Sequence, residues 1–242
     1  MPILKHSHKR DVLLTLRYGS PARYPLLSSI PRQYHNAVLM RFVYSKPANF
    51  FYARVPKCAN STVMATLGTH LGVKDDGTIN ANGLKKRLNS FPTVRQFNNA
   101  FRFTIVRDPT TRIISGYLDK IAPNKGEDGE GRLPYVGFME FLQELEAMDF
   151  KRNAHFLPQT SIIPGGTGGM DYVGRVETLQ SDLEEICKRV FGSYNGISNE
   201  TSHQTNAANQ KQQFLVPDTV KLIRRLYEAD FEVLKYAPPV AS

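Results

Sequence analysis

Alternation between short apolar runs and helix-spaced segments is the feature that most limits how this chain can fold. The runs, rich in aromatic and β-branched residues, occupy 50–55, 101–106 and 171–176, and the helix-spaced segments that follow them occupy 61–71, 110–121 and 178–191. Strands that alternate with helices predict an α/β fold in which helices cover both faces of a parallel sheet. We therefore expect a three-layer α/β sandwich with a central parallel sheet.

The rest of the chain fits one domain. Further helices are expected at 83–99, 136–147 and 217–234. We see no internal repeat and no domain boundary, so the prediction is a single domain over 1–242. Within it, 1–48 is punctuated by prolines and is predicted to be an irregular N-terminal arm with short elements, while 49–236 forms the core.

Charge and cysteine content narrow the class of protein. There are 31 Lys and Arg against 22 Asp and Glu, a net charge of +9, which favours an anionic partner such as phosphate, sulfate, nucleic acid, an acidic glycan or a membrane surface. The two cysteines, Cys58 and Cys187, exclude a disulfide framework and a Cys-based zinc site. The apolar runs fall short of the roughly 20 residues of a membrane span and of a signal-peptide core. We expect a soluble, cytoplasmic protein without a metal.

The segment Pro56–Thr62 follows the first predicted strand and has the composition of an anion-binding loop. Backbone N–H groups of Asn60, Ser61 and Thr62 would open the next helix, where open donors and the positive dipole end favour phosphate. Lys57 adds a mobile positive charge. This is not a Walker A loop, because the lysine precedes the small residues and glycine is absent. An ordinary turn, with Ser61 as helix N-cap and a solvated Lys57, is the alternative.

A second candidate loop follows the second strand. Arg107 leaves the strand end, so that its guanidinium can reach the same crevice, and Ser115 lies on the next helix. Arginine matches the geometry of phosphate, and a hydroxyl can complete a monoester site. Asp108 is read as a turn or ion-pair residue. Two anion-binding strand ends imply a ligand with two separated phosphates.

With both loops in view, the sequence resembles the sulfotransferases that use 3′-phosphoadenosine 5′-phosphosulfate (PAPS). VPKCANST (55–62) and IVRDPTTRIISGY (105–117) match that family's two phosphate motifs in type, order and separation. HFLPQ at 155–159, YVGRVETL at 172–179 and LYEADFE at 226–232 are similar to segments of its carbohydrate branch, sulfotransferase family 2. The likeness spans about 50–236. It departs at Ala59-Asn60, where many members have a glycine.

The resemblance implies a P-loop NTPase-like core and sulfuryl transfer from PAPS to an acceptor hydroxyl, which we expect to belong to a carbohydrate. Lys57 would lie near the bridging oxygen as a catalytic residue. The nucleotide contacts implied are Lys57, Cys58, Ala59, Asn60, Ser61 and Thr62 at the 5′-phosphosulfate, and Arg107 and Ser115 at the 3′-phosphate. No metal is implied. We interpret Cys58 as a small filler rather than a nucleophile.

A hydroxyl acceptor needs a base, and histidine is the usual choice near neutral pH. Of the six histidines, His155 is the preferred candidate because it lies in a branch-like segment, with Asp119 and Glu177 as alternatives. Arg112 suits either a structural ion pair or a phosphate contact, and we favour the structural role. The polar segment 193–213 is a candidate cover for the nucleotide, with Lys211 near the 3′-phosphate.

Two rival functions stay open. One is a nucleotide-dependent phosphotransferase on the same core, which the absent Walker A loop and the lack of an acidic Mg²⁺ partner disfavour. The other is a basic nucleic-acid-binding domain, which the dispersed basic residues and the absence of a recognised binding motif disfavour.

Overall fold

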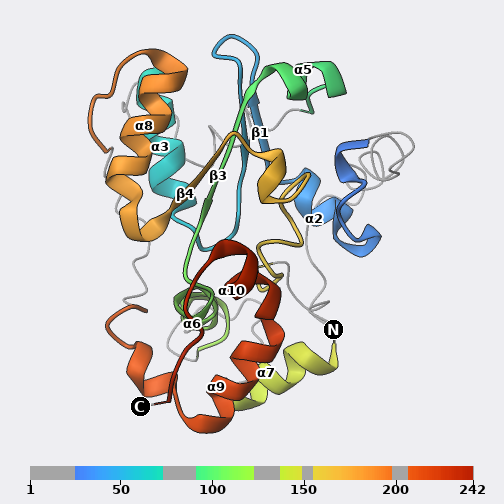
Figure 1. Ribbon diagram of the computed structural model, residues 1–242. Coiled ribbons are helices and arrows are strands. Elements are labelled where there is room, and N and C mark those ends of the chain that lie inside the picture. Colours follow the sequence, from blue (N-terminus) through green and yellow to red (C-terminus); the bar gives the residue numbers. More distant parts are fainter. Residues whose placement is uncertain (1–24, 73–90, 123–136, 149–154, 198–206, 242) are drawn as a thin grey trace, which may run out of the picture.

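The computed structural model describes residues 25–72, 91–122, 137–148, 155–197 and 207–241 (Figure 1). The first part of the helix expected from residue 83, the loop at 123–134, and His6, His8 and His203 lie outside the described residues.

The sheet has four strands, which lie in the order of the chain: β1 (Phe42–Ser45), β2 (Phe50–Ala53), β3 (Phe101–Val106) and β4 (Tyr172–Arg175). The three strands expected from the sequence pair in parallel, with Phe50 opposite Phe101 and Phe103 opposite Tyr172. Their parallel arrangement is confirmed. The sheet as a whole is mostly rather than wholly parallel, because β1 is an antiparallel edge strand.

Strand β1 lies inside the segment that the sequence predicted to be an irregular arm. All four of its residues are buried, and Tyr44 pairs with Phe51 across the hairpin to β2. Such a short run, two residues before Pro47, carries little strand signal of its own, and its partner supplies the rest. The hairpin turns through Asn49, whose φ of 49° places it in the left-handed region that asparagine tolerates better than most residues.

Helices cover the two faces of the sheet. Figure 1 shows α3 (Asn60–His70) and α8 (Leu179–Phe191) together on one face, and α2 (His35–Leu39) on the other. A capping box between Thr93 and Gln96 starts α5 (Val94–Asn99), which leads into β3. The arrangement is an α/β fold consistent with a three-layer sandwich.

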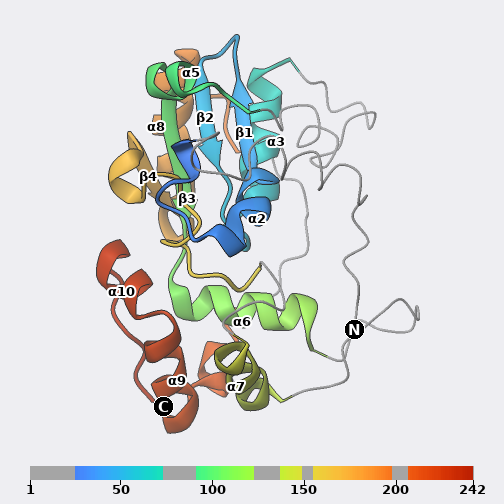
Figure 2. The same ribbon diagram turned by 90° about the vertical axis from the view of Figure 1, so that its right-hand side faces the viewer.

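A further group of helices lies beyond the carboxyl ends of the parallel strands, and Figure 2 shows it below the sheet. It consists of α6 (Pro109–Lys120), α7 (Phe138–Ala147), α9 (Pro217–Leu226) and α10 (Glu228–Leu234). Short 3₁₀ helices occupy Pro25–Leu27, Arg32–Tyr34, Thr167–Gly169, Val176–Thr178 and Lys211–Phe214.

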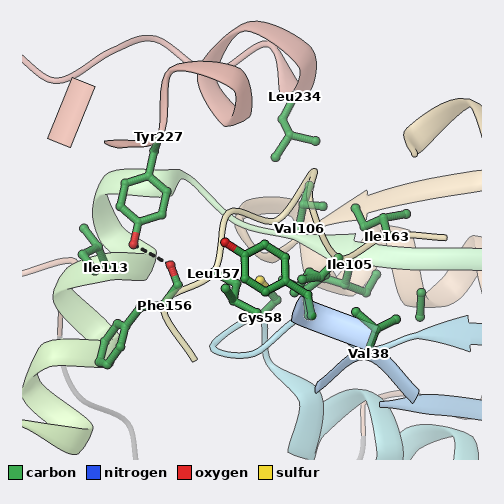
Figure 3. Close-up of a cluster of buried hydrophobic side chains, with 14 of the residues drawn as sticks. Val38, Cys58, Ile105, Val106, Ile113, Phe156, Leu157, Ile163, Tyr227 and Leu234 are labelled. Carbon is green, nitrogen blue, oxygen red and sulfur yellow. Dashed lines mark hydrogen bonds between the residues drawn. The ribbon is translucent and has the colours of Figure 1, made fainter. Parts of the chain in front are cut away.

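The prediction of a single helix over 217–234 is wrong in one respect, because this segment forms two helices, α9 and α10, separated at Tyr227. That residue has φ −121° and ψ 23°, outside helical values. Its buried side chain donates a hydrogen bond to the carbonyl of Phe156 at 2.7 Å (Figure 3). A tertiary contact with a segment 71 residues away therefore accompanies the break, and the local helical pattern does not reveal it.

The core joins the sheet to the helices beyond its carboxyl ends. Within the sheet, Tyr52 stacks on Phe103 with ring centroids 4.8 Å apart. The apolar side chains Phe138, Phe141, Leu142 and Leu145 of α7 are buried, and Tyr117 of α6 packs against Phe138 and Phe141. Buried side chains of β2, β3, α6 and α7 belong to one hydrophobic cluster.

Candidate active site

The two candidate loops leave neighbouring parallel strands at the same edge of the sheet. Residues 54–59 connect β2 to α3, and Arg107 and Asp108 connect β3 to α6. The guanidinium Nη1 of Arg107 donates a hydrogen bond to the backbone carbonyl of Lys57 at 3.3 Å. The loops that the sequence singled out separately are therefore in contact, where ligands of parallel α/β sheets bind.

Backbone geometry opens the N-terminus of α3. Lys57 and Ala59 both have positive φ, 66° and 51°, and Ala59 is the N-cap of α3 without a capping side chain. The first backbone bond of the helix runs from Val63 N–H to the Ala59 carbonyl at 3.0 Å. In the part of the chain that the structure describes, the N–H groups of residues 60–62 have no acceptor. Ser61 is the second helical residue rather than the N-cap.

The side chains of Asn60 and Cys58 support this loop from inside. Asn60 accepts a hydrogen bond from the Tyr52 hydroxyl at 2.7 Å and donates one to the Val55 carbonyl at 2.8 Å. The thiol of Cys58 is buried and donates to Gln159 Oε1 at 3.3 Å. Burial raises the pKa of the Cys58 thiol to about 12, so it remains protonated and poorly nucleophilic at neutral pH.

Lys57 is an enclosed cation, with a side chain only 15% exposed. Its Nζ lies 3.5 Å from Oδ2 of Asp119 on α6, and Lys120 Nζ lies 2.9 Å from the same oxygen. Burial lowers the pKa of Lys57, an effect that Asp119 opposes and that the positive charges of Lys120 and Arg107 reinforce. The cluster therefore concentrates positive charge beside the first loop.

The second loop is organised by the carboxylate of Asp108. It accepts hydrogen bonds from the N–H groups of Thr110 and Thr111 at 3.3 and 3.0 Å, and so caps α6. Lys211 Nζ lies 2.9 Å from the same group. Asp108 is thus both a turn residue and an ion-pair residue. Its pair with Lys211 places that lysine at the second loop, beside the residue that follows Arg107.

Arg107 and Ser115 are enclosed to different degrees. Burial lowers the pKa of Arg107, and the nearby carboxylates of Glu177 and Asp108 oppose this effect. Ser115 is 2% exposed on α6. Arg107 is the more accessible of the two candidate 3′-phosphate contacts.

Arg112 has the structural role that we favoured, although its partners are backbone carbonyls. The side chain is 1% exposed. Its Nε donates to the Pro56 carbonyl at 2.9 Å, and its Nη2 donates to the His155 carbonyl at 3.1 Å. Arg112 therefore joins the first loop to the segment that carries His155.

His155 lies within the electrostatic reach of Lys57. Burial lowers its pKa to about 3, reinforced by the positive charges of Arg41, Lys120 and Lys57 and opposed by Asp119. The imidazole is neutral at neutral pH and carries a lone pair that can accept a proton. Its depressed pKa makes it a weak base in the absence of a bound anion.

Among the described residues, the other titratable candidates have partners of their own. Both carboxylate oxygens of Glu177 accept hydrogen bonds at 2.8 Å, from the Asp108 N–H and from the Tyr236 hydroxyl. His35 bonds the Ile30 carbonyl, and His70 stacks on Phe191. Asp119 is held by Lys57 and Lys120. Of the residues considered as bases that the structure describes, His155 and Asp119 are the ones beside Lys57.

Two residues of this neighbourhood were missed by the sequence analysis. Gln159 and Asp230 are both 0% exposed, and each hydrogen-bonds into the site or its support. The available signal was their place in the segments 155–159 and 226–232, which carried the family resemblance. Neither residue type suggests chemistry by itself, so composition and spacing gave them no role.

Comparison with known families decides the class. A model of the sulfotransferase family matches residues 40–237, which is most of the chain. The chain belongs to the sulfotransferase family. The match supports family 2, as the motifs indicated, and transfer of a sulfuryl group to a hydroxyl-bearing acceptor. The matched range also includes strand β1, which the sequence analysis had placed in the N-terminal arm. No curated protein and no solved structure gave a match.

Neither a metal-binding cluster nor a membrane-spanning helix is found among the described residues. Among them, no group of three or more His, Cys, Asp and Glu side chains is placed to hold a metal ion. In the same residues of this sulfotransferase, no helix combines the length and the apolar character that crossing a membrane requires.

Proposed function

We propose that this sulfotransferase takes its sulfuryl group from PAPS and transfers it by in-line displacement to a hydroxyl, which we expect to lie on a carbohydrate. The observation that carries the proposal is the contact between Arg107 Nη1 and the Lys57 carbonyl at 3.3 Å. It joins two loops of different anion-binding chemistry at one edge of the sheet. A nucleotide with phosphates at both the 5′ and 3′ positions suits such a pair of loops. We also propose that the core is of the P-loop NTPase-like type.

The 5′-phosphosulfate is assigned to the first loop. The N–H groups of residues 60–62, open toward the start of α3, would donate to it, and the dipole of the helix would favour its charge. The hydroxyls of Ser61 and Thr62 can add two further donors. Ala59 and Cys58 contribute backbone and close packing rather than functional side chains.

The 3′-phosphate is assigned to the second loop. Arg107 offers a planar set of donors, and Lys211 lies close enough to add charge once it leaves Asp108. Ser115 would contribute its hydroxyl from α6. Binding the far end of the nucleotide fixes its register, and positioning of this kind is a large part of group-transfer catalysis.

Sulfuryl transfer, like phosphoryl transfer, asks mainly for positioning and charge stabilisation. The S–O bond to the 5′-phosphate breaks as a bond to the acceptor oxygen forms, and the hydroxyl proton passes to His155. Lys57 stabilises the charge that grows on the departing phosphate. The negative charge of the bound donor raises the pKa of His155, which strengthens that base when it is needed.

The acceptor class is inferred from the sequence. The carbohydrate acceptor follows from the branch-like segments, and the net charge of +9 suits an acidic glycan. The cytoplasmic location and the absence of a metal requirement stay predictions.

Nucleotide selectivity tests the proposal. Thermal unfolding is compared with 3′-phosphoadenosine 5′-phosphate (PAP, the product nucleotide), with ATP–Mg²⁺ and with duplex DNA at equal concentration. PAP alone should raise the melting temperature strongly, because a ligand that binds only the folded state stabilises it. Stabilisation by ATP–Mg²⁺ or DNA but not by PAP would instead support one of the rival functions. An acceptor panel with PAPS, read by mass spectrometry, then identifies the hydroxyl.

A further inference from the structure

The side chain of Gln159 makes an unusual pair of contacts with the end of β3. It is 0% exposed. Its Nε2 donates to the Arg107 carbonyl at 2.8 Å, while its Oε1 accepts from the Arg107 N–H at 3.0 Å. A neighbouring strand would satisfy the same two backbone groups in a similar way. The carboxamide therefore holds the backbone of Arg107 on both sides of the Cα that carries its side chain.

The same oxygen also contacts the other phosphate-binding loop. Cys58 Sγ donates to Gln159 Oε1 at 3.3 Å, and Cys58 lies between the two residues of positive φ in that loop. One buried carboxamide thus touches both the backbone of Arg107 and the interior of the first loop. Its three contacts constrain how far apart the two loops stand.

Gln159 is in turn held by a buried carboxylate on α10. Asp230 is 0% exposed, and its Oδ2 accepts the Gln159 N–H at 2.8 Å. Its Oδ1 accepts from the N–H and the hydroxyl of Thr160 at 2.9 and 2.8 Å. A buried carboxylate needs such donors, so its hydrogen bonds define one position for the chain at 159–160.

We propose that Gln159 is a positioning residue that fixes the spacing of the two phosphate-binding loops, and that Asp230 orients it. The inference rests on the proposed function for the identity of the ligand. A nucleotide with two phosphates binds tightly only if both loops reach it at once, because the second contact is then intramolecular. A ligand with one phosphate uses a single loop and gains nothing from correct spacing.

The test compares two nucleotides by isothermal titration calorimetry. PAP has phosphates at both positions and adenosine 5′-monophosphate (AMP) has only the 5′ one, so the ratio of their dissociation constants measures the gain from engaging both loops. In Q159L, PAP should bind about tenfold more weakly while AMP changes less than twofold. D230N should act in the same direction with a smaller change. The exposed Gln180 on α8 gives the matched control, Q180L, which should leave both constants unchanged.

The outcomes separate cleanly. An unchanged ratio in a folded Q159L, or equal weakening of both nucleotides, would overturn the positioning role. If Q159L does not fold, Q159E decides, since it keeps an acceptor but loses the donor to the Arg107 carbonyl; an unchanged ratio there overturns the proposal. If the wild-type protein itself binds PAP no better than AMP, the proposed function fails as well, whatever the variants do.

Discussion

The two helices that follow β2 and β3 begin in opposite ways. α3 starts from Ala59, a residue in the left-handed region with no capping side chain, and the amides of its first turn point to no acceptor among the described residues. α6 starts from Asp108, whose carboxylate bonds the amides of Thr110 and Thr111, with Pro109 at its first position. The start of α3 can therefore accept an anion from a ligand, whereas the start of α6 is already capped by the carboxylate of Asp108.

This difference assigns distinct chemistry to the two loops. An open helix end binds an anion through backbone donors, which substitution of side chains does not remove. At the closed end, an anion has to be held by side chains, and those that we propose are Arg107, Ser115 and Lys211. Nucleotide binding should therefore tolerate loss of the Ser61 or Thr62 hydroxyl in the first loop, whereas it should not tolerate loss of the Arg107 side chain in the second.

The largest expected effect is on the rate, in K57A. Removing the cation that we propose stabilises the leaving phosphate should lower kcat by about 1000-fold, while PAP binding falls by less than about tenfold because the backbone donors remain. Steady-state kinetics and calorimetry measure the two quantities. K188A, at an exposed position on α8, controls for the lost charge. Transfer at a near-normal rate in K57A would remove Lys57 from the catalytic role.

The second effect separates side-chain from backbone binding of the nucleotide. R107A should weaken PAP binding by about 10- to 100-fold, the value of one or two charge-assisted hydrogen bonds. S61A in the first loop should weaken it by less than about fivefold, and R95A, at an exposed arginine of α5, should leave it unchanged. Equal losses in S61A and R107A would contradict the distinction between the loops.

The third effect concerns His155, which is partly buried beside the first loop and neutral at neutral pH. Burial lowers the pKa of His155 to about 3 in the folded protein, whereas its ordinary value, expected in the unfolded chain, is near 6.5. Between pH 6.5 and pH 3 the unfolded chain therefore binds a proton at His155 that the folded chain does not. The contribution of His155 to the free energy of unfolding is therefore fully present above about pH 6.5 and is lost as the pH falls toward 3. Its contribution should decline by about 2 kcal/mol between pH 7 and pH 5.

Urea unfolding at both pH values measures this decline. H155Q, which cannot titrate in that range, should show a loss smaller by the same amount. A wild-type protein and an H155Q variant with parallel losses would show that His155 is not buried in the neutral form. The same variant should also have a strongly reduced rate if His155 accepts the proton of the hydroxyl.

The smallest effects fall on stability at the two helix starts, and they have opposite signs. A59G should raise the free energy of unfolding by about 1 kcal/mol, because glycine adopts positive φ without steric cost. D108A should lower it by about 1 kcal/mol through loss of the cap. A65G, within α3, is the control for glycine and should lower it by about 1 kcal/mol. Destabilisation by A59G equal to that of A65G would mean that Ala59 is not strained.

Local pattern predicted the elements that depend on local interactions. The strands β2, β3 and β4 came from runs of apolar residues, and α3, α6 and α8 from helical spacing close to their observed bounds. The candidate loops at 56–62 and 107–115 followed from their positions after strands. The edge strand β1 and the break at Tyr227 were missed because each depends on a partner distant in the sequence.

The sequence by itself determined the family, the order of strands and helices along the chain, and which residues carry charge at the strand ends. Only the tertiary structure decided that the Arg107 guanidinium meets the Lys57 carbonyl, that Arg112 joins Pro56 to His155, and that Gln159 bridges the loops. Those contacts join residues between 43 and 101 positions apart. Their geometry depends on how α6 and α10 pack beyond the sheet. Helical spacing in the sequence predicts that a helix has a buried face, but it does not say which distant segment that face contacts.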